Sequence, residues 1–229
     1  MTAQKRLFDC LVLLVGAVVW IPCLVACALV IWLTDGRPLF YVSERRVFGR
    51  RRLFTAKLRV MRRDAEKIAN RKTVPVGETR FLNLPNDSPL YTPVGRFFER
   101  WCMTELPQLL HVLKGEMTLV GNRPLPEDVI ASLREAYPYA EDRFLSLCGL
   151  TGPVQLVGRE RITDEDRLRL EIAYSRLVSV SYSIRLDFLV LLYTVLVATR
   201  VRKPLTVGEV EQLMRVFASE AFADEPCAA

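Results

Sequence analysis

Three basic side chains occupy positions where the local pattern would hold them ready for phosphate. Lys57 and Arg59 alternate in a short run typical of a β-strand, so both are expected on one face, suited to phosphate or carboxylate contacts. The alternative for this pair is a charge that faces solvent or lipid. Arg123 lies between Asn122 and Pro124 in a stiff turn, and a fixed guanidinium can bind two phosphate oxygens together. These residues indicate phosphate chemistry.

Chemistry that depends on histidine and cysteine has little support. The chain holds one histidine, His111, and six cysteines, of which none forms a CxxC pair. A zinc site needs several such ligands at close spacing. We interpret the cysteines as reduced, small hydrophobic residues of a cytosol-facing protein, with disulfides as the alternative.

A predicted helix begins at Thr104 and Glu105. Its apolar residues recur at helical spacing, so that their face should pack inward: Leu106, Leu109, Leu110 and Leu113. Thr104 suits the N-cap position. Glu105 suits the first turn, where the helix dipole stabilises an acid.

The composition describes a folded body with one membrane element. The 229 residues are 51% hydrophobic and 25% charged, which is too polar for a transporter with many spans. The formal net charge of +6 predicts anionic partners.

Residues 11–33 form an apolar run without charge, long enough as a helix to cross a hydrocarbon core. Pro22 lies in its middle, where it removes a backbone hydrogen bond. Basic residues flank both ends, and the positive-inside rule favours cytoplasmic positions for both. We therefore expect a re-entrant helix broken at Pro22. A single span and a buried core helix remain as alternatives.

The positive charge is local. Residues 37–63 hold ten Lys/Arg and one acid, a net charge of about +9, which leaves about −3 for the remainder of the chain. A basic segment beside an apolar helix is typical of contact with anionic lipids. Nucleic-acid binding is the rival interpretation, and we predict that the chain binds none.

The remaining pattern predicts a mixed α/β, predominantly helical fold. Two short strands are expected at residues 39–42 and 53–56, with a turn at 48–50. A loop rich in Pro, Gly and Asn should occupy 74–93. Further helices are expected to start near residues 64, 125 and 163 and to cover 183–200, and residues 218–229 are expected to form a loose acidic tail. The apolar helix at 183–200 would either lie in the membrane interface or pack against the body.

Several motifs, read in order, resemble the bacterial sugar transferases, which are monotopic polyprenyl-phosphate phosphoglycosyl transferases. They are KRLFD (5–9), KLRVM (57–61), VGRF (94–97), ELPQLLHVLKGEMTLVGNRP (105–124), LTGPVQLVGR (150–159), LEIAY (170–174) and SIRLDFLVLLYTV (183–195). The resemblance covers about residues 4 to 200. It implies that the N-terminal helix is re-entrant.

The resemblance also implies a reaction. In that family an Asp-Glu pair, with Mg²⁺, moves a sugar phosphate from a nucleotide-diphosphate sugar to undecaprenyl phosphate, which starts exopolysaccharide, O-antigen or glycan assembly. The pair corresponds to Thr104-Glu105, so the aspartate is replaced by a threonine. Glu105 would act as base or nucleophile and could hold Mg²⁺, while Thr104 is a cap, a nucleophile or a metal ligand.

Other positions also depart from the family pattern, among them Asn122, where the family usually has proline. A catalytically silent relative that acts as a membrane scaffold or binds polyprenyl phosphate is therefore the alternative function. Arg96, Gln155 and Arg159 are weaker candidates for substrate contact. For Arg159 the alternative is an ion pair with the acidic helix that follows it.

We divide the chain into a membrane helix at 1–36, a catalytic body at 37–203, and a C-terminal helix with an acidic tail at 204–229. Amphipathic helices of the body should lie at the interface. The expected location is the cytosolic face of the bacterial inner membrane. The expected partners are the nucleotide-sugar, undecaprenyl phosphate, anionic lipids and downstream glycosyltransferases.

Overall fold

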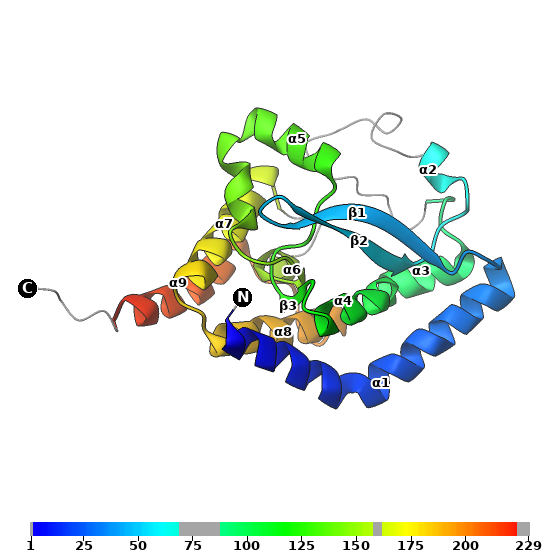
Figure 1. The fold of residues 1–229 in the computed structure, drawn as a ribbon, viewed down its shortest axis with the longest axis horizontal. Helices are drawn as coiled ribbons and strands as arrows, with labels where there is room; N and C mark the ends of the chain where they lie inside the picture. Colours follow the sequence, from blue (N-terminus) through cyan, green and yellow to red (C-terminus); the bar gives the residue numbers. More distant parts are fainter. Residues whose placement is uncertain (1, 69–87, 158–161, 224–229) are drawn as a thin grey trace, which may run out of the picture.

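The computed structural model describes residues 2–68, 88–157 and 162–223. Helices predominate and short strands accompany them, which confirms the mixed α/β, mostly helical fold. Figure 1 shows a long N-terminal helix, α1, along the lower edge and a two-stranded ribbon above it, while the helices α5, α7 and α9 lie on the left. One long apolar helix therefore lies along one side of a packed body.

Helix α1 covers Ala3–Asp35 and is long and apolar enough to cross a membrane. The Thr2 side chain caps its start, and Gly36, at φ +68°, ends it in a conformation that favours glycine. Figure 1 shows α1 bent near its middle. Pro22 lies exposed inside the helix and lacks the N–H that would continue the hydrogen-bond ladder. The helix nevertheless continues through Pro22, so the expected break is a bend.

The buried residues of α1 fall into two groups, one towards each end. They are Lys5, Phe8, Asp9 and Leu13 in the first half, and Cys27 and Ile31 in the second. Between the groups, residues 14–26, all described by the structure, hold no buried side chain. Val18 in this stretch is 80% exposed. The body thus holds both ends of α1 and leaves its apolar middle uncovered.

Two pairs of strands lie in the body. Strands β1 (Phe40–Phe48) and β2 (Arg51–Leu58) are antiparallel and are joined at Gly49, which has φ +47°. This ribbon confirms the strands and the turn expected from the sequence. Strands β3 (Thr118–Val120) and β4 (Gly149–Thr151) are parallel and were not expected, because each has only three residues.

Helices account for most of the other described residues. In chain order they are α2 (Ala65–Ile68), α3 (Pro93–Arg100), the 3₁₀ helix η1 (Met103–Gln108), α4 (Leu109–Leu113), α5 (Glu127–Ala136), the 3₁₀ helix η2 (Pro138–Phe144), α6 (Pro153–Val157), α7 (Asp164–Val180), α8 (Ile184–Ala198) and α9 (Val207–Ala223). Thr163 and Ser183 cap α7 and α8 with their side chains. The starts expected near 64, 125 and 163 and the helix expected at 183–200 are therefore confirmed.

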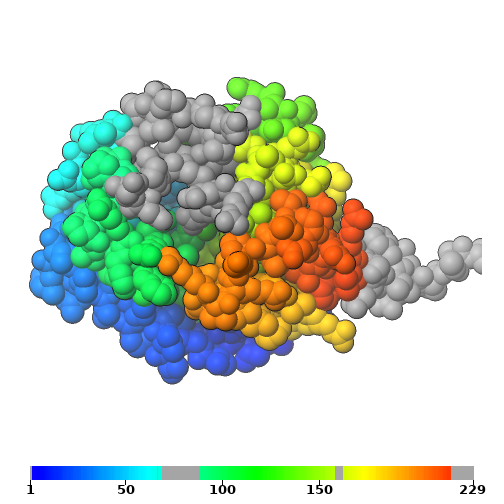
Figure 2. All heavy atoms as spheres, turned by 180° about the vertical axis from the view of Figure 1, so that it is seen from behind, coloured from blue at the N-terminus to red at the C-terminus, as the bar shows by residue number. Residues whose placement is uncertain are grey.

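The apolar core has two parts. The larger gathers buried residues of α5 to α9 around β3, including Leu133, Leu156, Leu168 and Val190. The smaller packs the second half of α1 against β2 and α3, where Ile31 and Leu58 are almost fully buried. Figure 2, seen from behind, shows α1 along the lower edge with α3 and α8 above it. Apolar packing thus fixes α1 to the body at two places.

The predicted helix that begins at Thr104 differs from the structure. Thr104 lies inside η1, and Cys102, in the left-handed conformation with φ +55°, takes the N-cap position. The inward face is confirmed in part, because Leu106, Leu109 and Leu113 are partly buried against the core, whereas Leu110 is 46% exposed. Gln108 and Val112 are buried as well, since a tight 3₁₀ turn around Pro107 changes the helical register there.

Two expected segments fall largely outside the described residues. Of the loop at 74–93, only residues 88–93 are described, and there Thr92 caps α3. At the C-terminus, helix α9 continues to Ala223, so the expected loose tail is helical at its start. Residues 224–229 lie outside the described part. The domain boundaries stay predictions.

Candidate active site

The centre of the candidate site is Glu105, which η1 presents beside the end of β2. Thr104 and Pro107 stand three residues apart in η1, share a face, and are both buried. The Glu105 side chain retains 16% of its exposure. Burial of Thr104 and Pro107 therefore fixes η1 against the body, and the Glu105 carboxylate stays partly exposed at its edge.

Lys57 binds Glu105 from β2. Its Nζ atom lies 2.7 Å from Glu105 Oε1, across a separation of 48 residues in sequence. Lys57 pairs with Tyr41 in the ribbon and is about a third exposed. The pairing of β1 with β2 therefore fixes the position along the ribbon from which the Lys57 ammonium group reaches the Glu105 carboxylate.

Arg123 binds the same carboxylate oxygen from the turn after β3. Its Nη2 atom donates a hydrogen bond to Glu105 Oε1, and its side chain is 18% exposed. Among the described contacts, two cations therefore share one carboxylate oxygen of Glu105. Lys57 and Arg123, two of the three cations that the sequence marks for phosphate contact, thus meet on Glu105.

Arg45 is a further cation of this site that the sequence interpretation did not single out. Burial lowers its pKa, and Arg123, Asp128 and Glu105 are among the charged groups close enough to act on it. Arg45 stands four pairs along the ribbon from the Tyr41–Lys57 pair, and because that number is even it shares a face with Lys57. Alternation along residues 41–45 was the signal that could have identified it.

Arg59 has a different environment from Lys57. Its guanidinium donates to the backbone carbonyls of Asp35 at 2.9 Å, Gly36 at 2.9 Å, Pro38 at 2.6 Å and Met61 at 3.4 Å. Strand β2 ends at Leu58, so strand alternation does not extend to Arg59. These bonds hold the end of α1 to the ribbon. A phosphate contact for Arg59 stays a prediction that they do not support.

The weaker candidates do not join the Glu105 group through any contact that the structure describes. Arg96 is exposed on α3 and donates to the Ser88 carbonyl at 3.5 Å. Gln155 is half-buried in α6, where its backbone N–H donates to the Gly152 carbonyl at 3.0 Å. Arg159 lies outside the described residues. Substrate contact for these three stays a prediction.

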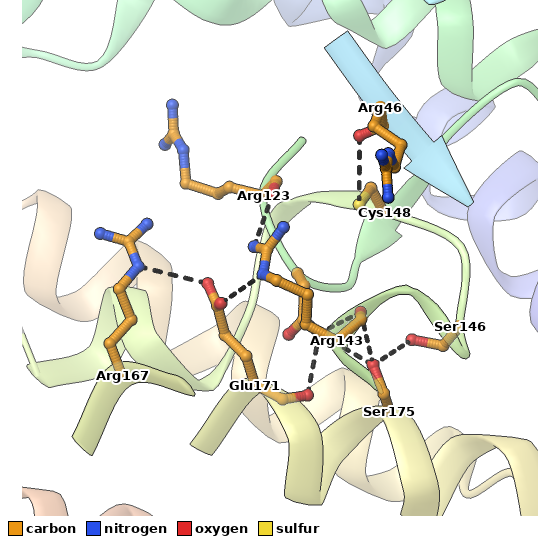
Figure 3. A network of polar contacts seen from close by, with 9 residues as sticks. Arg46, Arg123, Arg143, Ser146, Cys148, Arg167, Glu171 and Ser175 are labelled. Atoms are coloured by element: carbon orange, nitrogen blue, oxygen red, sulfur yellow. Dashed lines mark hydrogen bonds and ion pairs between the residues drawn. The ribbon is translucent and has the colours of Figure 1, made fainter. Parts of the chain in front are cut away.

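A buried ion pair between Arg143 and Glu171 contacts the backbone of Arg123 (Figure 3). Arg143 Nε lies 2.6 Å from Glu171 Oε2, with side-chain exposures of 0% and 1%. Burial alone would raise the pKa of Glu171, but Arg143 and Arg167 lower it below its usual value. Glu171 therefore stays ionised and holds Arg143 firmly.

The arrangement suits chemistry on phosphate. A carboxylate with two cations can act on phosphorus while the cations turn to phosphoryl oxygens. The segment that carries it, η1, contacts both α1 and β2. The site therefore lies beside the long apolar helix. Comparison with known proteins agrees: the sequence model described as bacterial sugar transferase matches residues 1–201.

The chain belongs to the bacterial sugar transferase family.

Curated relatives in this family are similar over most of the chain. The galactosyl transferase CpsE of Streptococcus agalactiae is 37% identical over 69% of this chain and 34% of its own length. The exopolysaccharide production protein ExoY of Sinorhizobium fredii is 29% identical over 84% of each chain. The undecaprenyl-phosphate glucose phosphotransferase of Komagataeibacter xylinus is 32% identical over 81% of this chain and 35% of its own length. The chain thus spans about a third of two of these relatives and most of the third.

Position 104, where the family resemblance leads us to expect an aspartate, holds a threonine in this chain. Thr104 is 4% exposed, and its hydroxyl is neutral at physiological pH. A threonine at this position needs a base before it can attack phosphorus. Of the two residues at positions 104 and 105, only Glu105 therefore has a carboxylate.

Proposed function

We propose that this chain transfers a sugar phosphate from a nucleotide-diphosphate sugar to undecaprenyl phosphate and so starts polysaccharide or glycan assembly. The observation that carries the proposal is the Glu105 carboxylate bound by Lys57 and Arg123 beside α1. The names of the relatives support it, since one is an undecaprenyl-phosphate glucose phosphotransferase and another an undecaprenyl-phosphate galactose phosphotransferase.

In the proposed reaction, an oxygen of the enzyme attacks the β-phosphorus of the donor. The bond from that phosphorus to the bridging oxygen breaks, and the nucleoside monophosphate leaves with this oxygen. A phosphate oxygen of the polyprenyl phosphate then attacks the same phosphorus and releases the enzyme. Glu105 supplies the attacking oxygen or removes the proton from Thr104. Lys57 and Arg123 stabilise the charge that gathers on the phosphoryl oxygens.

The family resemblance also implies Mg²⁺, and Glu105 is the residue that would hold it. Magnesium is commonly bound through one or two carboxylates together with substrate phosphates, so a single carboxylate fits. Among the described residues no cluster of three or more Asp, Glu, His or Cys offers another site. When bound, the ion would neutralise part of the diphosphate charge.

A re-entrant α1 on the cytosolic face of the inner membrane belongs to the same proposal. A straight helix of 33 residues is about 50 Å long, enough to place its ends on opposite sides of a bilayer. Here one polar body binds both ends, through Lys5 at the start and through Arg59 at Asp35 and Gly36. These two contacts support a topology in which both ends of α1 lie on one side of the membrane.

Helices α3 and α8 are the proposed interfacial helices. Each contacts α1 and has exposed apolar side chains on or next to it: Phe97 on α3 and Trp101 directly after α3, and Ile184, Phe188, Leu192 and Val195 on α8. Apolar surface of this extent beside a membrane helix favours burial among lipid headgroups. Anionic lipids, held by the exposed arginines at 50–52, and downstream glycosyltransferases complete the proposed partners. Absence of nucleic-acid binding stays a prediction.

The test is release of nucleoside monophosphate from a panel of nucleotide-sugars, with undecaprenyl phosphate and the chain in nanodiscs. We expect Glu105→Gln to lower kcat by at least about a hundredfold, because the ionised group is lost. Ser179→Ala, an exposed change on α7, is the control and should leave release unchanged.

The buried, neutral Thr104 favours one second candidate, a silent relative that binds polyprenyl phosphate as a scaffold. The same assay separates the two functions. Absence of turnover by the native chain, together with turnover by Thr104→Asp, would establish the scaffold. Turnover by the native chain that Glu105→Gln removes would establish the transferase.

A further inference from the structure

Asn122, the residue directly before Arg123, is the centre of a buried hydrogen-bond network. It is 2% exposed. Its Nδ2 atom lies 2.9 Å from the Arg143 carbonyl, 2.8 Å from the Glu171 carbonyl and 2.8 Å from Ser175 Oγ. One amide group therefore ties the turn after β3 to both η2 and α7.

The backbone of Arg123 is held by the same network. Arg143 Nη2 donates to the Arg123 carbonyl at 2.9 Å, while Arg143 Nε binds Glu171. In Figure 3 the Arg123 side chain extends away from this network, whereas its carbonyl faces it. The buried side chains thus fix the backbone of Arg123, while its guanidinium extends away from the network.

The turn is also closely packed on its other side. A Cβ atom at Gly121 would lie 2.6 Å from the Leu147 carbonyl oxygen and 2.8 Å from the Gly149 nitrogen. No side chain fits that space, so the backbone of the turn lies directly against the strand that follows. Hydrogen bonds from the Asn122 side chain then hold the turn from its buried side.

We propose that Asn122, Arg143 and Glu171 are positioning residues, which hold Arg123 against Glu105 so that its guanidinium meets the donor phosphate. The inference rests on the proposed function. Arginine has several rotatable bonds, and a small rotation of its backbone moves the guanidinium by several ångströms. The buried hydrogen bonds of Asn122 restrict this rotation of the Arg123 backbone before the donor binds.

The main test is a double-mutant cycle on nucleoside monophosphate release. Asn122→Leu removes the amide donor and should lower kcat/KM about tenfold. Arg123→Gln should lower it further, and the double variant should lose no more than Arg123→Gln alone, because Asn122 acts through Arg123. The cycle of Asn122→Leu with Lys57→Gln is the matched control and should be additive. Additive losses in both cycles would overturn the proposal.

Two further variants separate positioning from stability. Thr163→Ala removes the cap of α7 without touching the network, so it should lower the unfolding midpoint and leave kcat/KM unchanged. If Asn122→Leu does not fold, Ser175→Ala deletes one acceptor of the Asn122 amide. It should cost about threefold in kcat/KM in the native background and nothing in Arg123→Gln. A loss of equal size in both backgrounds would count against positioning.

A measurement without turnover distinguishes failure of this inference from failure of the proposed function. The coupling between Arg123→Gln and Glu105→Gln is measured by chemical unfolding, in the native background and with Asn122→Leu or Ser175→Ala. We expect the coupling to fall by half or more when the network is cut. An unchanged coupling would refute positioning even in an active enzyme. A reduced coupling in a chain without turnover would support positioning and reject the transferase.

Discussion

At the scale of single residues, the charge on the candidate site depends on which cations reach one carboxylate. Lys57 and Arg123 both bind Glu105 Oε1, and Arg45 lies near them, whereas Arg59 is used on backbone carbonyls. The neighbouring basic residues Lys57 and Arg59 thus have different roles. Removing the charge of Lys57 should impair catalysis, whereas removing that of Arg59 should lower stability.

The pair of positions 57 and 59 tests this division. Lys57→Met should lower kcat/KM by about 10- to 100-fold with little effect on stability, because its side chain is partly exposed and faces Glu105. Arg59→Met removes four hydrogen bonds to carbonyls and should lower the free energy of unfolding by about 2 kcal/mol or more. Kinetics and chemical unfolding of both variants check the prediction. The reverse pattern would contradict these assignments.

Two cysteines should differ sharply in reactivity. Burial raises the pKa of the Cys148 thiol to about 12, so almost none is thiolate at pH 8, while Cys102 is exposed. Because thiolate is the reactive form, iodoacetamide at pH 8 should label Cys102 and leave Cys148 unmodified until urea unfolds the chain. Mass spectrometry of peptides gives the answer. Equal labelling of both thiols in the folded protein would show that Cys148 is accessible.

At the scale of elements, α1 is unusual because it is held at both ends and uncovered in its middle. A bend is what allows one helix to contact the body twice, and Pro22 weakens the backbone ladder within that uncovered stretch. The exposed apolar middle gains from burial in lipid, about 25 cal/mol per Å². In the re-entrant topology that we propose, the depth of α1 in the membrane follows from its bend.

Replacing Pro22 with alanine should straighten α1 and favour a spanning topology, because alanine restores the missing hydrogen bond. Single cysteines at positions 2 and 40, introduced after all six native cysteines have been replaced, report the side through a membrane-impermeant maleimide. In the native background both should label from the cytosolic side. Labelling from that side in the Pro22→Ala variant as well would contradict the prediction.

At the scale of the whole molecule, one buried cluster joins elements from both ends of the chain. Lys5 on α1 pairs with Asp187 on α8, and Tyr174 on α7 donates to Asp187 at 2.8 Å. Lys5 Nζ also lies 2.8 Å from the Val120 carbonyl on β3. The cluster links the membrane helix to the strand that leads to Arg123. Docking of α1 and order in the site are therefore coupled.

Loss of one partner of this cluster should be costly. Asp187→Asn leaves Lys5 charged in a site where the two side chains are 3% and 0% exposed, and should lower the free energy of unfolding by about 3 kcal/mol. The surface pair Arg176–Asp142 is the control, and Asp142→Asn should cost less than about 1 kcal/mol. Unfolding of the three proteins in one detergent compares them. Equal costs would mean that the Lys5 site is open to water.

The sequence by itself determined those features that local pattern controls. The apolar run, the proline in it, the β1–β2 ribbon and the caps at Thr163 and Ser183 follow from composition, alternation and hydrogen-bonding side chains within a few residues. Ordered motifs determined the family, and with it the expectation that Glu105 is central. Short-range rules suffice there because each feature depends on near neighbours.

Only the tertiary structure decided which charges meet. Lys57 and Arg123 reach Glu105 from 48 and 18 residues away, and Asn122 reaches Glu171 across 49. A 3₁₀ turn displaced Thr104 from its expected cap, and the end of β2 separated Arg59 from Lys57. Such outcomes depend on packing between distant segments, which no local periodicity records. The same packing makes Glu105, with its two cations, the residue on which the proposed chemistry depends.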